Sequence, residues 1–158
     1  MTVLVVSDTH KNFGEFYDLV LQYKSKVDFI IHLGDGESDI DDLFMLEPNI
    51  PVRYVSGNCD WGSLKPSSDV VSVGGAKIFI CHGHNFGVKY SLDRLALEAK
   101  RLGAQTALFG HTHRQQYTVI NGVQCLNPGS LGEPRDGKRG YALIEIVNGQ
   151  VNCCLKQV

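Results

Sequence analysis

The chain has 158 residues, of which 43% are hydrophobic and 20% are charged, and its formal net charge is −2. This length fits one domain spanning residues 1–158, large enough to bury a core without covalent staples. The small net charge gives no electrostatic reason to expect nucleic acid or an anionic membrane as a partner. We therefore expect no long polyanion among its substrates.

Cysteine usage and the apolar pattern point to a cytoplasmic protein. The chain has five cysteines, an odd number without the CxxC spacing of zinc or redox sites, which argues against a disulfide framework. No basic segment precedes the first apolar stretch, and nowhere do about 18 apolar residues run together. We expect neither a signal peptide nor a membrane span. The sequence allows a homo-oligomer.

The first half of the chain alternates between two kinds of apolar pattern. Short runs rich in β-branched residues at 3–6, 29–33 and 52–55 are typical of buried strands. Residues 13–23 have apolar side chains at helical spacing, and residues 40–46 form a second, shorter helical pattern. This alternation predicts parallel strands joined by crossover helices.

The second half contains three dipeptides that favour tight hairpin turns. They are Gly74-Gly75 between 70–73 and 77–81, Asn121-Gly122 between 117–120 and 123–126, and Asn148-Gly149 between 141–147 and 151–155. A helix is expected over residues 91–101 with Ser91 as its cap, and a short strand over 107–109. The whole pattern predicts an α/β fold of two packed mixed β-sheets with helices on the outer faces.

Carboxylate and imidazole side chains recur in pairs directly after the strand-like runs. The pairs are Asp8 and His10, His82 and His84, and His111 and His113. A spacing of two residues sends both side chains of an extended segment to the same side. Each pair alone is typical of an exposed turn, but five of the six histidines of the chain occur in these pairs. Their recurrence favours a site for divalent cations.

Two further motifs place oxygen ligands after strands. Gly34 allows a tight turn that projects Asp35, whose two carboxylate oxygens could bridge two cations. Asn58 adds a neutral amide oxygen after Gly57, although each of these dipeptides alone usually marks a plain turn. His32 lies within a predicted strand, so we expect it to be packed or to support a ligand rather than to bind metal itself.

Taken together, these motifs resemble those of the calcineurin-like metallophosphoesterase superfamily. The series is Asp8-x-His10, Gly34-Asp35, Gly57-Asn58-x-Asp60, His82-Gly83-His84 and Gly110-His111-x-His113, extended by Asn127-Pro128-Gly129-Ser130. In length and in the Gly-Asn-Cys-Asp variant, the chain is most similar to small single-domain phosphodiesterases of bacteria and archaea. The resemblance implies a four-layer α/β/β/α sandwich, which agrees with the predicted strands and hairpins.

The resemblance also implies two divalent metal ions and their ligands. One ion would be held by Asp8, His10, Asp35 and His113, and the other by Asn58, His82, His111 and the second oxygen of Asp35. Manganese is the first choice, and nickel, iron and zinc also suit this mixture of imidazole and oxygen ligands. By this resemblance the protein is a hydrolase that attacks small phosphate diesters with a metal-bridging hydroxide.

The sequence departs from the superfamily at the position that follows Asn58. Relatives often carry there a histidine that protonates the departing oxygen, but this chain has Cys59. A thiol with a pKa of about 8.5 is a weaker acid catalyst than an imidazolium, and Cys59 could equally be an apolar filler. Cys59 and His84 are therefore the two candidates for the proton donor.

Basic residues near these motifs are candidates for contacting the phosphate of the substrate. Lys11 stands where relatives commonly have glycine, and is either such a cation or an exposed residue without a role. Arg135, Lys138 and Arg139 lie in the glycine-rich segment 132–140, which reads as a loop near the site.

Two alternative functions stay open. A phosphomonoesterase would use the same chemistry, but a compact chain leaves little sequence for a cap around a small monoester, which favours diesters. The phosphoesterase-like subunit of retromer resembles this fold and is a protein-binding scaffold, so the fold alone does not decide. All seven implied ligands are of competent types, which favours catalysis.

Overall fold

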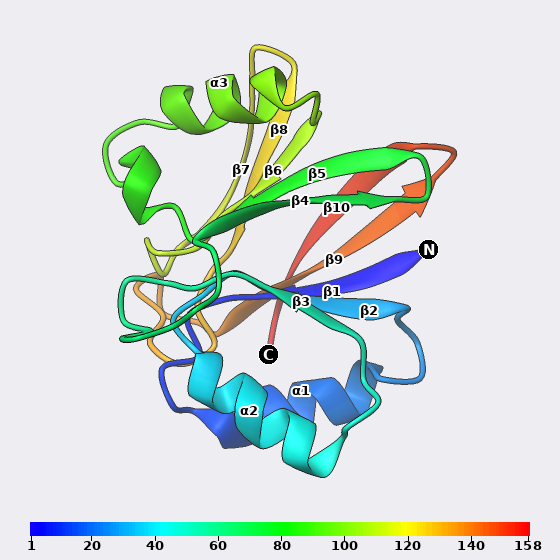
Figure 1. Ribbon diagram of the computed structural model, residues 1–158, viewed down its shortest axis with the longest axis vertical. Helices are drawn as coiled ribbons and strands as arrows, with labels where there is room; N and C mark the ends of the chain where they lie inside the picture. The colour runs from blue at the N-terminus through cyan, green and yellow to red at the C-terminus, as the bar shows by residue number, and fades with distance from the viewer.

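The computed structural model describes residues 1–158 and consists of two five-stranded β-sheets packed face to face, with helices on both outer faces (Figure 1). This arrangement confirms the predicted four-layer α/β/β/α sandwich of two mixed sheets. The layers bring the loops at one end of both sheets together, on the left in Figure 1.

The first sheet combines a parallel core with an antiparallel edge. Its strands are β1 (Thr2–Val6), β2 (Phe29–His32), β3 (Val52–Tyr54), β9 (Gly140–Val147) and β10 (Gln150–Gln157), in the spatial order β10-β9-β1-β2-β3. Strand β1 pairs in parallel with β2 and antiparallel with β9. The predicted crossovers and the C-terminal hairpin are thereby both confirmed.

The second sheet has a parallel centre and two antiparallel edges. Its strands are β4 (Ser68–Val73), β5 (Ala76–Cys81), β6 (Thr106–Leu108), β7 (Gln115–Ile120) and β8 (Val123–Pro128), in the order β4-β5-β6-β8-β7. The hairpins β4–β5 and β7–β8 turn at the predicted Gly-Gly and Asn-Gly dipeptides.

Helices cover the two outer faces. Helices α1 (Phe13–Tyr23) and α2 (Glu37–Leu46) pack on the first sheet, whereas α3 (Asp93–Arg101) packs on the second, preceded by the 3₁₀ turn η1 (His84–Phe86) (Figure 1). None of these helices combines the length and the apolar character that a membrane crossing requires.

Strand β1 shows why its sequence is apolar at every position. Val3 and Val5 are buried in the core between the two sheets, whereas Leu4 and Val6 are buried in the layer beneath α1 and α2. Successive side chains of a strand point to opposite faces, so a strand covered on both sides needs an unbroken apolar run. The end of β1, where Asp8 follows, is consequently held rigidly from both faces.

Two helices begin at other residues than the sequence predicts. Helix α2 begins at Glu37 instead of residue 40, because the Asp60 carboxylate accepts the backbone N–H groups of Gly36 and Glu37, both at 2.9 Å. Helix α3 begins at Asp93, with Leu92 at the N-cap position. Ser91 still accepts the N–H of Asp93 at 3.1 Å, from one residue further out than expected.

Candidate metal centre

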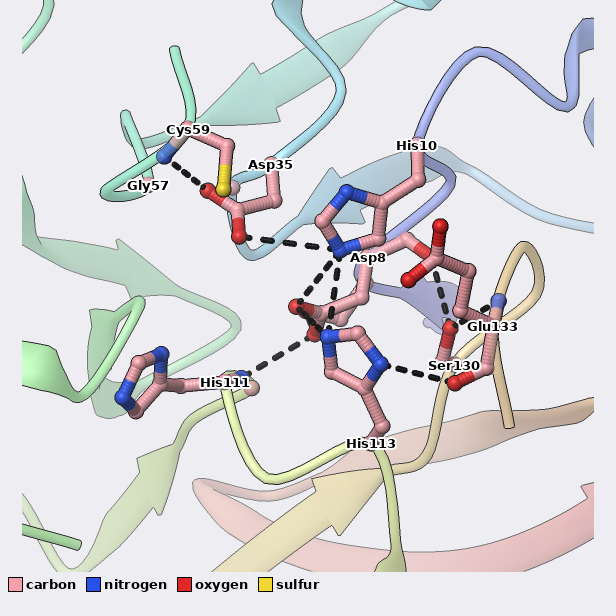
Figure 2. Close-up of polar contacts among 12 residues, drawn as sticks. Asp8, His10, Asp35, Gly57, Cys59, His111, His113, Ser130 and Glu133 are labelled. Carbon is pink, nitrogen blue, oxygen red and sulfur yellow. Dashed lines mark hydrogen bonds and ion pairs between the residues drawn. The ribbon is translucent and has the colours of Figure 1, made fainter. Parts of the chain in front are cut away.

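Side chains from the loops of both sheets converge at the end of β1 (Figure 2). Asp8 Oδ1 lies 3.1 Å from His113 Nε2 and 3.7 Å from His10 Nε2. Asp35 Oδ2 lies 3.7 Å from the same His10 nitrogen. The ligand atoms of these four residues all lie within 4.8 Å of one another. The set predicted to share one metal is thus brought together.

The histidines are oriented by backbone carbonyl groups behind them. His113 Nδ1 is 2.7 Å from the carbonyl oxygen of Glu133, and His82 Nδ1 is 2.8 Å from that of Leu33. Because a carbonyl oxygen only accepts, each Nδ1 donates, which leaves Nε2 as the nitrogen that could bind a metal. Both Nε2 atoms face carboxylate oxygens, with His113 Nε2 3.1 Å from Asp8 Oδ1 and His82 Nε2 3.3 Å from Asp35 Oδ2.

The Asp8 carboxylate has one satisfied and one unsatisfied oxygen. Oδ2 accepts hydrogen bonds from the Ser7 hydroxyl at 2.5 Å and from the His111 N–H at 3.0 Å. Oδ1 is buried and has no hydrogen-bond partner, although it faces the imidazoles of His10 and His113. A buried oxygen without a donor, surrounded by imidazole nitrogens, fits a divalent cation. The residues present are therefore suited to the metal that the donor set implies.

Both acids of the centre are ionised. Burial alone would raise the pKa of Asp8, but the neighbouring imidazoles of His10 and His113 outweigh burial and hold that pKa well below its usual range. Burial likewise opposes ionisation of Asp35, and the hydrogen bond with His82 still lowers the pKa of Asp35 to about 2. The centre therefore presents two negative charges at neutral pH.

The two oxygens of Asp35 have different partners. Asp35 Oδ1 accepts the backbone N–H of Cys59 at 2.7 Å, and Oδ2 faces both His10, at 3.7 Å, and His82, at 3.3 Å. Gly57 makes this possible, since a Cβ at that position would lie 2.0 Å from Oδ1. Asp35 therefore lies between residues of the two predicted ligand sets.

The residues predicted to hold the second metal lie next to the first set. Asn58 Oδ1 is 3.0 Å from His82 Nε2, which also faces Asp35. The His111 ring lies 5.1 Å from the His82 ring but points away from Asp8, and it makes neither an ion pair nor a hydrogen bond with the carboxylates (Figure 2). Burial, followed by the charge of His82, lowers the pKa of His111 to about 4. His111 is therefore neutral at pH 7, but the structure does not bring its ring to the carboxylates as it does the rings of His10 and His113.

The two candidate proton donors lie at the edge of the centre. Cys59 is exposed next to Asp35, and burial together with the charge of Asp35 raises the pKa of this thiol to about 11. The His84 ring lies 5.4 Å from that of His82, its Nδ1 is buried without a partner, and burial lowers the pKa of His84. Cys59 is therefore protonated and His84 neutral at pH 7.

Sequence reasoning missed the structural role of Asp60. Its carboxylate accepts four backbone N–H groups, those of Asp35 at 2.8 Å, Gly36 at 2.9 Å, Glu37 at 2.9 Å and Gly57 at 2.7 Å. It joins the turn that carries Asp35 to the loop that carries Asn58. Its position within Gly57-Asn58-Cys59-Asp60 was the available signal, but that motif alone does not reveal the partners.

Other buried polar residues support the loops that carry the ligands. Asn127 Nδ2 donates to the carbonyl of Gly110 at 2.8 Å, and the Ser130 hydroxyl donates to that of Asp8 at 2.7 Å. His32 is fully buried with its Nε2 3.2 Å from the Thr9 hydroxyl, and burial lowers the pKa of His32 to about 4. His32 is thus a packed, neutral residue, in line with the sequence expectation.

The backbone of the centre is strained. Five of the seven predicted ligands have a positive φ, namely Asp8 (53°), His10 (46°), Asp35 (55°), His111 (70°) and His113 (58°). Such conformations of residues with a Cβ cost about 1–3 kcal/mol each and persist where the surrounding structure enforces them. Their concentration here indicates that the loop shapes serve the site.

The basic residues predicted to contact phosphate differ in their positions and in their protein partners. Arg139 forms an ion pair with Glu15 at 3.0 Å and donates to the Leu131 carbonyl at 2.9 Å, so its guanidinium is already engaged. Lys11 helps to line a small pocket of about 160 Å³ over the metal centre. Arg135 lies in a neighbouring cleft, and Lys138 is exposed without an ion pair. Arg139 therefore has protein partners, whereas the other three residues make no ion pair.

Residues 1–149 match the calcineurin-like phosphoesterase superfamily domain, so the chain belongs to this superfamily. A probable metallophosphoesterase of Bacillus subtilis is 33% identical over 150 residues, which are 94% of this chain and 86% of that protein. The crystal structure of a predicted phosphoesterase from Streptococcus pneumoniae superimposes with a TM-score of 0.76 at 27% identity, covering 98% of this chain and 97% of that one.

Two further relatives differ in what their names state. A phosphodiesterase of Methanocaldococcus jannaschii is 26% identical over 144 residues, covering 82% of this chain and 83% of that protein. Vacuolar protein sorting-associated protein 29 of Schizosaccharomyces pombe is 29% identical over 136 residues, covering 82% of this chain and 72% of that protein. The relatives thus support a phosphoesterase hydrolase and also include a sorting protein.

Proposed function

We propose that the protein is a binuclear metal-dependent phosphodiesterase that hydrolyses small phosphate diesters. The observation that carries this proposal is the buried Asp8 Oδ1, which has no hydrogen-bond partner and faces the nitrogens of His10 and His113. A buried carboxylate oxygen without a hydrogen-bond donor is favoured where a positive charge can lie beside it. Membership of the phosphoesterase superfamily supports the same chemistry.

The ligands divide into two sets that share Asp35. Asp8, His10, Asp35 and His113 would hold one ion, and Asn58, His82, His111 and Asp35 would hold the other. We favour manganese, with nickel, iron and zinc as competent substitutes for this oxygen and imidazole set. When bound, two divalent cations lower the pKa of water and neutralise charge that develops on the phosphate.

The protein's own groups position the reaction and manage its proton. The carbonyls of Glu133 and Leu33 hold His113 and His82 in the tautomer that offers Nε2 to the site. Cys59 remains a thiol at neutral pH because its pKa is about 11, so it gives up a proton only slowly. Cys59 and His84 remain our two candidates for protonating the departing oxygen.

The open surroundings of the centre favour diesters over monoesters. The pocket of about 160 Å³ over the centre shares Lys11, Cys59 and other residues with a neighbouring groove of about 620 Å³. That groove is lined by Trp61 and Leu64, whose side chains are 91% and 99% exposed. A second alcohol group therefore has room beside the phosphorus, and a relative is named a phosphodiesterase.

The alternatives are a phosphomonoesterase of the same chemistry and a protein-binding scaffold. The relative named vacuolar protein sorting-associated protein 29 supports the scaffold alternative. Against it, every predicted ligand position holds a residue capable of binding metal. We also place the protein in the cytoplasm, which its five free cysteines support.

The test begins with metal-free protein prepared with a chelator. Hydrolysis of bis(4-nitrophenyl) phosphate and of 4-nitrophenyl phosphate is measured as Mn²⁺, Ni²⁺, Fe²⁺, Zn²⁺ or Mg²⁺ is restored. We expect metal-dependent hydrolysis with preference for the diester. Faster hydrolysis of the monoester would instead support a phosphomonoesterase.

The variant Asp35→Asn and its control Asp18→Asn localise the activity. Asp35→Asn should bind less metal and lose most hydrolysis with an unchanged circular dichroism spectrum, whereas Asp18 is exposed on α1 and its variant should behave as wild type. Protein that holds no stoichiometric metal and hydrolyses neither ester with any of the five cations would support the scaffold.

A further inference from the structure

A second cavity, of about 600 Å³, lies beside the metal centre. Its walls come from the segment after η1 and from the start of β7, and its polar lining includes Lys89, Tyr90, Thr112, Arg114 and Arg135. We call this cavity the basic cleft. Nothing in the proposed hydrolysis of a simple diester uses it.

The basic cleft shares a loop with the metal centre. Thr112, which lines the cleft, lies between His111 and His113, and Arg114 directly follows them. The backbone N–H of Arg135 donates to the carbonyl oxygen of His113 at 2.9 Å. A ligand whose phosphorus lies at the metal centre can therefore extend from there toward the cleft along this loop.

The cleft contains cationic side chains without counter-ions. Lys89, Arg114 and Arg135 are exposed, make no ion pair and donate no side-chain hydrogen bond, and no aspartate or glutamate lines the cleft. The neighbouring carboxylate of Asp136 is not part of the lining, and it already accepts the N–H of Gln115 at 2.7 Å. Three positive charges thus face one cavity in a chain whose formal net charge is −2.

Three cationic side chains elsewhere in the chain form ion pairs with glutamates. Lys24 pairs with Glu47 at 2.6 Å, Arg101 with Glu98 at 2.7 Å, and Arg139 with Glu15 at 3.0 Å. Unpaired like charges around one concavity raise the local concentration of anions. The two guanidinium groups also offer planar pairs of donors that match phosphate oxygens.

We propose that the basic cleft binds a second phosphate group of the substrate, so that the preferred diesters carry a phosphate on one of their alcohol groups. This proposal rests on the proposed phosphodiesterase function and names its substrate class. The Tyr90 ring, 95% exposed at the same cleft, offers a flat surface for a ring of that alcohol, such as a nucleobase.

Binding without metal provides the first test. Metal-free protein in EDTA is titrated with AMP, adenosine and inorganic phosphate and followed by NMR chemical shifts. We expect AMP to bind at least about tenfold more tightly than adenosine or inorganic phosphate, because only AMP combines the phosphate with a ring. Equal affinity of AMP and adenosine would overturn the proposal, and inorganic phosphate binding as tightly as AMP would make the cleft a site for the free ion.

Charge-removing variants locate this binding. Arg114→Gln and Arg135→Gln should each weaken AMP about tenfold or more, since each removes a charged hydrogen-bond donor. Lys100→Gln removes one positive charge from the exposed end of α3, outside the cleft, and should leave AMP affinity unchanged. Unaltered AMP affinity in both arginine variants would contradict the proposal.

A matched pair of substrates tests the loaded enzyme. Thymidine 5′-(4-nitrophenyl phosphate) and its 3′-phosphorylated form have the same leaving group and differ only in the second phosphate. We expect the 3′-phosphate to lower KM about tenfold in the wild type and in Lys100→Gln, and to have little effect in Arg114→Gln. A wild-type KM ratio near one would overturn the proposal.

The tests separate the two proposals. If no ester is hydrolysed with any cation, the phosphodiesterase function fails, whereas the AMP titration still reports on the cleft. If hydrolysis is metal-dependent but indifferent to the second phosphate, only the cleft proposal fails. Binding of a long single-stranded oligonucleotide far more tightly than AMP would overturn it in favour of a nucleic-acid surface.

Discussion

The metal centre and the basic cleft lie on two sides of the loop that carries His111 and His113. The centre lacks a positive charge beside its carboxylates, whereas the cleft lacks a negative charge beside its cations. In the centre, Asp8 Oδ1 is buried without a donor and faces the nitrogens of His10 and His113. In the cleft, Arg114 and Arg135 offer donors without an acceptor. One region suits a cation and the other an anion, which agrees with the metal-dependent phosphodiesterase that we propose.

Asp8→Asn should break the centre most completely. Because Asp8 Oδ2 accepts from Ser7 and the His111 N–H, the amide oxygen takes that place and the amide nitrogen replaces Oδ1. The amide then donates to His113 Nε2 where metal would bind. We expect metal-dependent hydrolysis to fall at least a hundredfold.

The metal-free stability of the same variant sharpens this prediction. At a pH alkaline enough to deprotonate the histidines, Asp8→Asn should melt in EDTA no lower than the wild type, because the new amide can donate to an imidazole nitrogen. Calorimetry of both proteins checks this. A clear loss of stability in the variant would mean that Asp8 serves the fold rather than a cation.

Asp60→Asn should disturb the centre without changing a ligand side chain. Its carboxylate accepts N–H groups of Asp35, Gly36, Glu37 and Gly57, and an amide would turn its own donor toward some of them. We expect a stability loss of about 2–4 kcal/mol and a tenfold to hundredfold weaker metal affinity. Denaturation and metal titration measure both, with Asp18→Asn as the matched control.

Cys59→His should alter the chemistry at the edge of the centre. An imidazole is a better proton donor than a thiol whose pKa is about 11, and a donor matters more when the leaving group is poor. We expect turnover of an alkyl diester to rise about tenfold relative to that of bis(4-nitrophenyl) phosphate. Equal changes with both substrates would show that neither Cys59 nor the histidine that replaces it protonates the departing oxygen.

Ionic strength should have the smallest of these effects. It should weaken binding at the basic cleft more than it affects the metal centre. The cleft side chains are exposed and screened by salt, whereas the ligands of the centre are largely buried. Between about 50 mM and about 200 mM NaCl, the KM advantage of the second phosphate should shrink a few-fold, whereas bis(4-nitrophenyl) phosphate should be little affected. Similar salt dependence for both substrates would argue against distinct regions.

Local sequence features predicted much of the fold. The alternating burial of residues 3–6 and the turns at Asn121-Gly122 and Asn148-Gly149 depend on neighbours along the chain, so pattern and turn chemistry suffice. The residues that gather at the centre were likewise predicted, because their motifs follow strand ends that meet at one edge.

What the sequence did not reveal depends on contacts between distant segments. The partners of Asp60 include residues 35–37, more than 20 positions away, so its cap on α2 is invisible in either segment alone. The different partners of the two Asp35 oxygens follow from how closely Gly57 approaches this side chain. Arg135 reaches the cleft of Arg114, whereas Arg139 in the same segment turns to Glu15.

The division of the ligands between the two sheets has a mechanical consequence. Asp8, His10 and Asp35 follow strands of the first sheet, whereas His82 and His113 follow strands of the second. An ion bound by both groups would link the two sheets of the sandwich. The melting temperature should therefore increase with the concentration of free metal. A chelator should weaken the packing between the two sheets before either sheet unfolds.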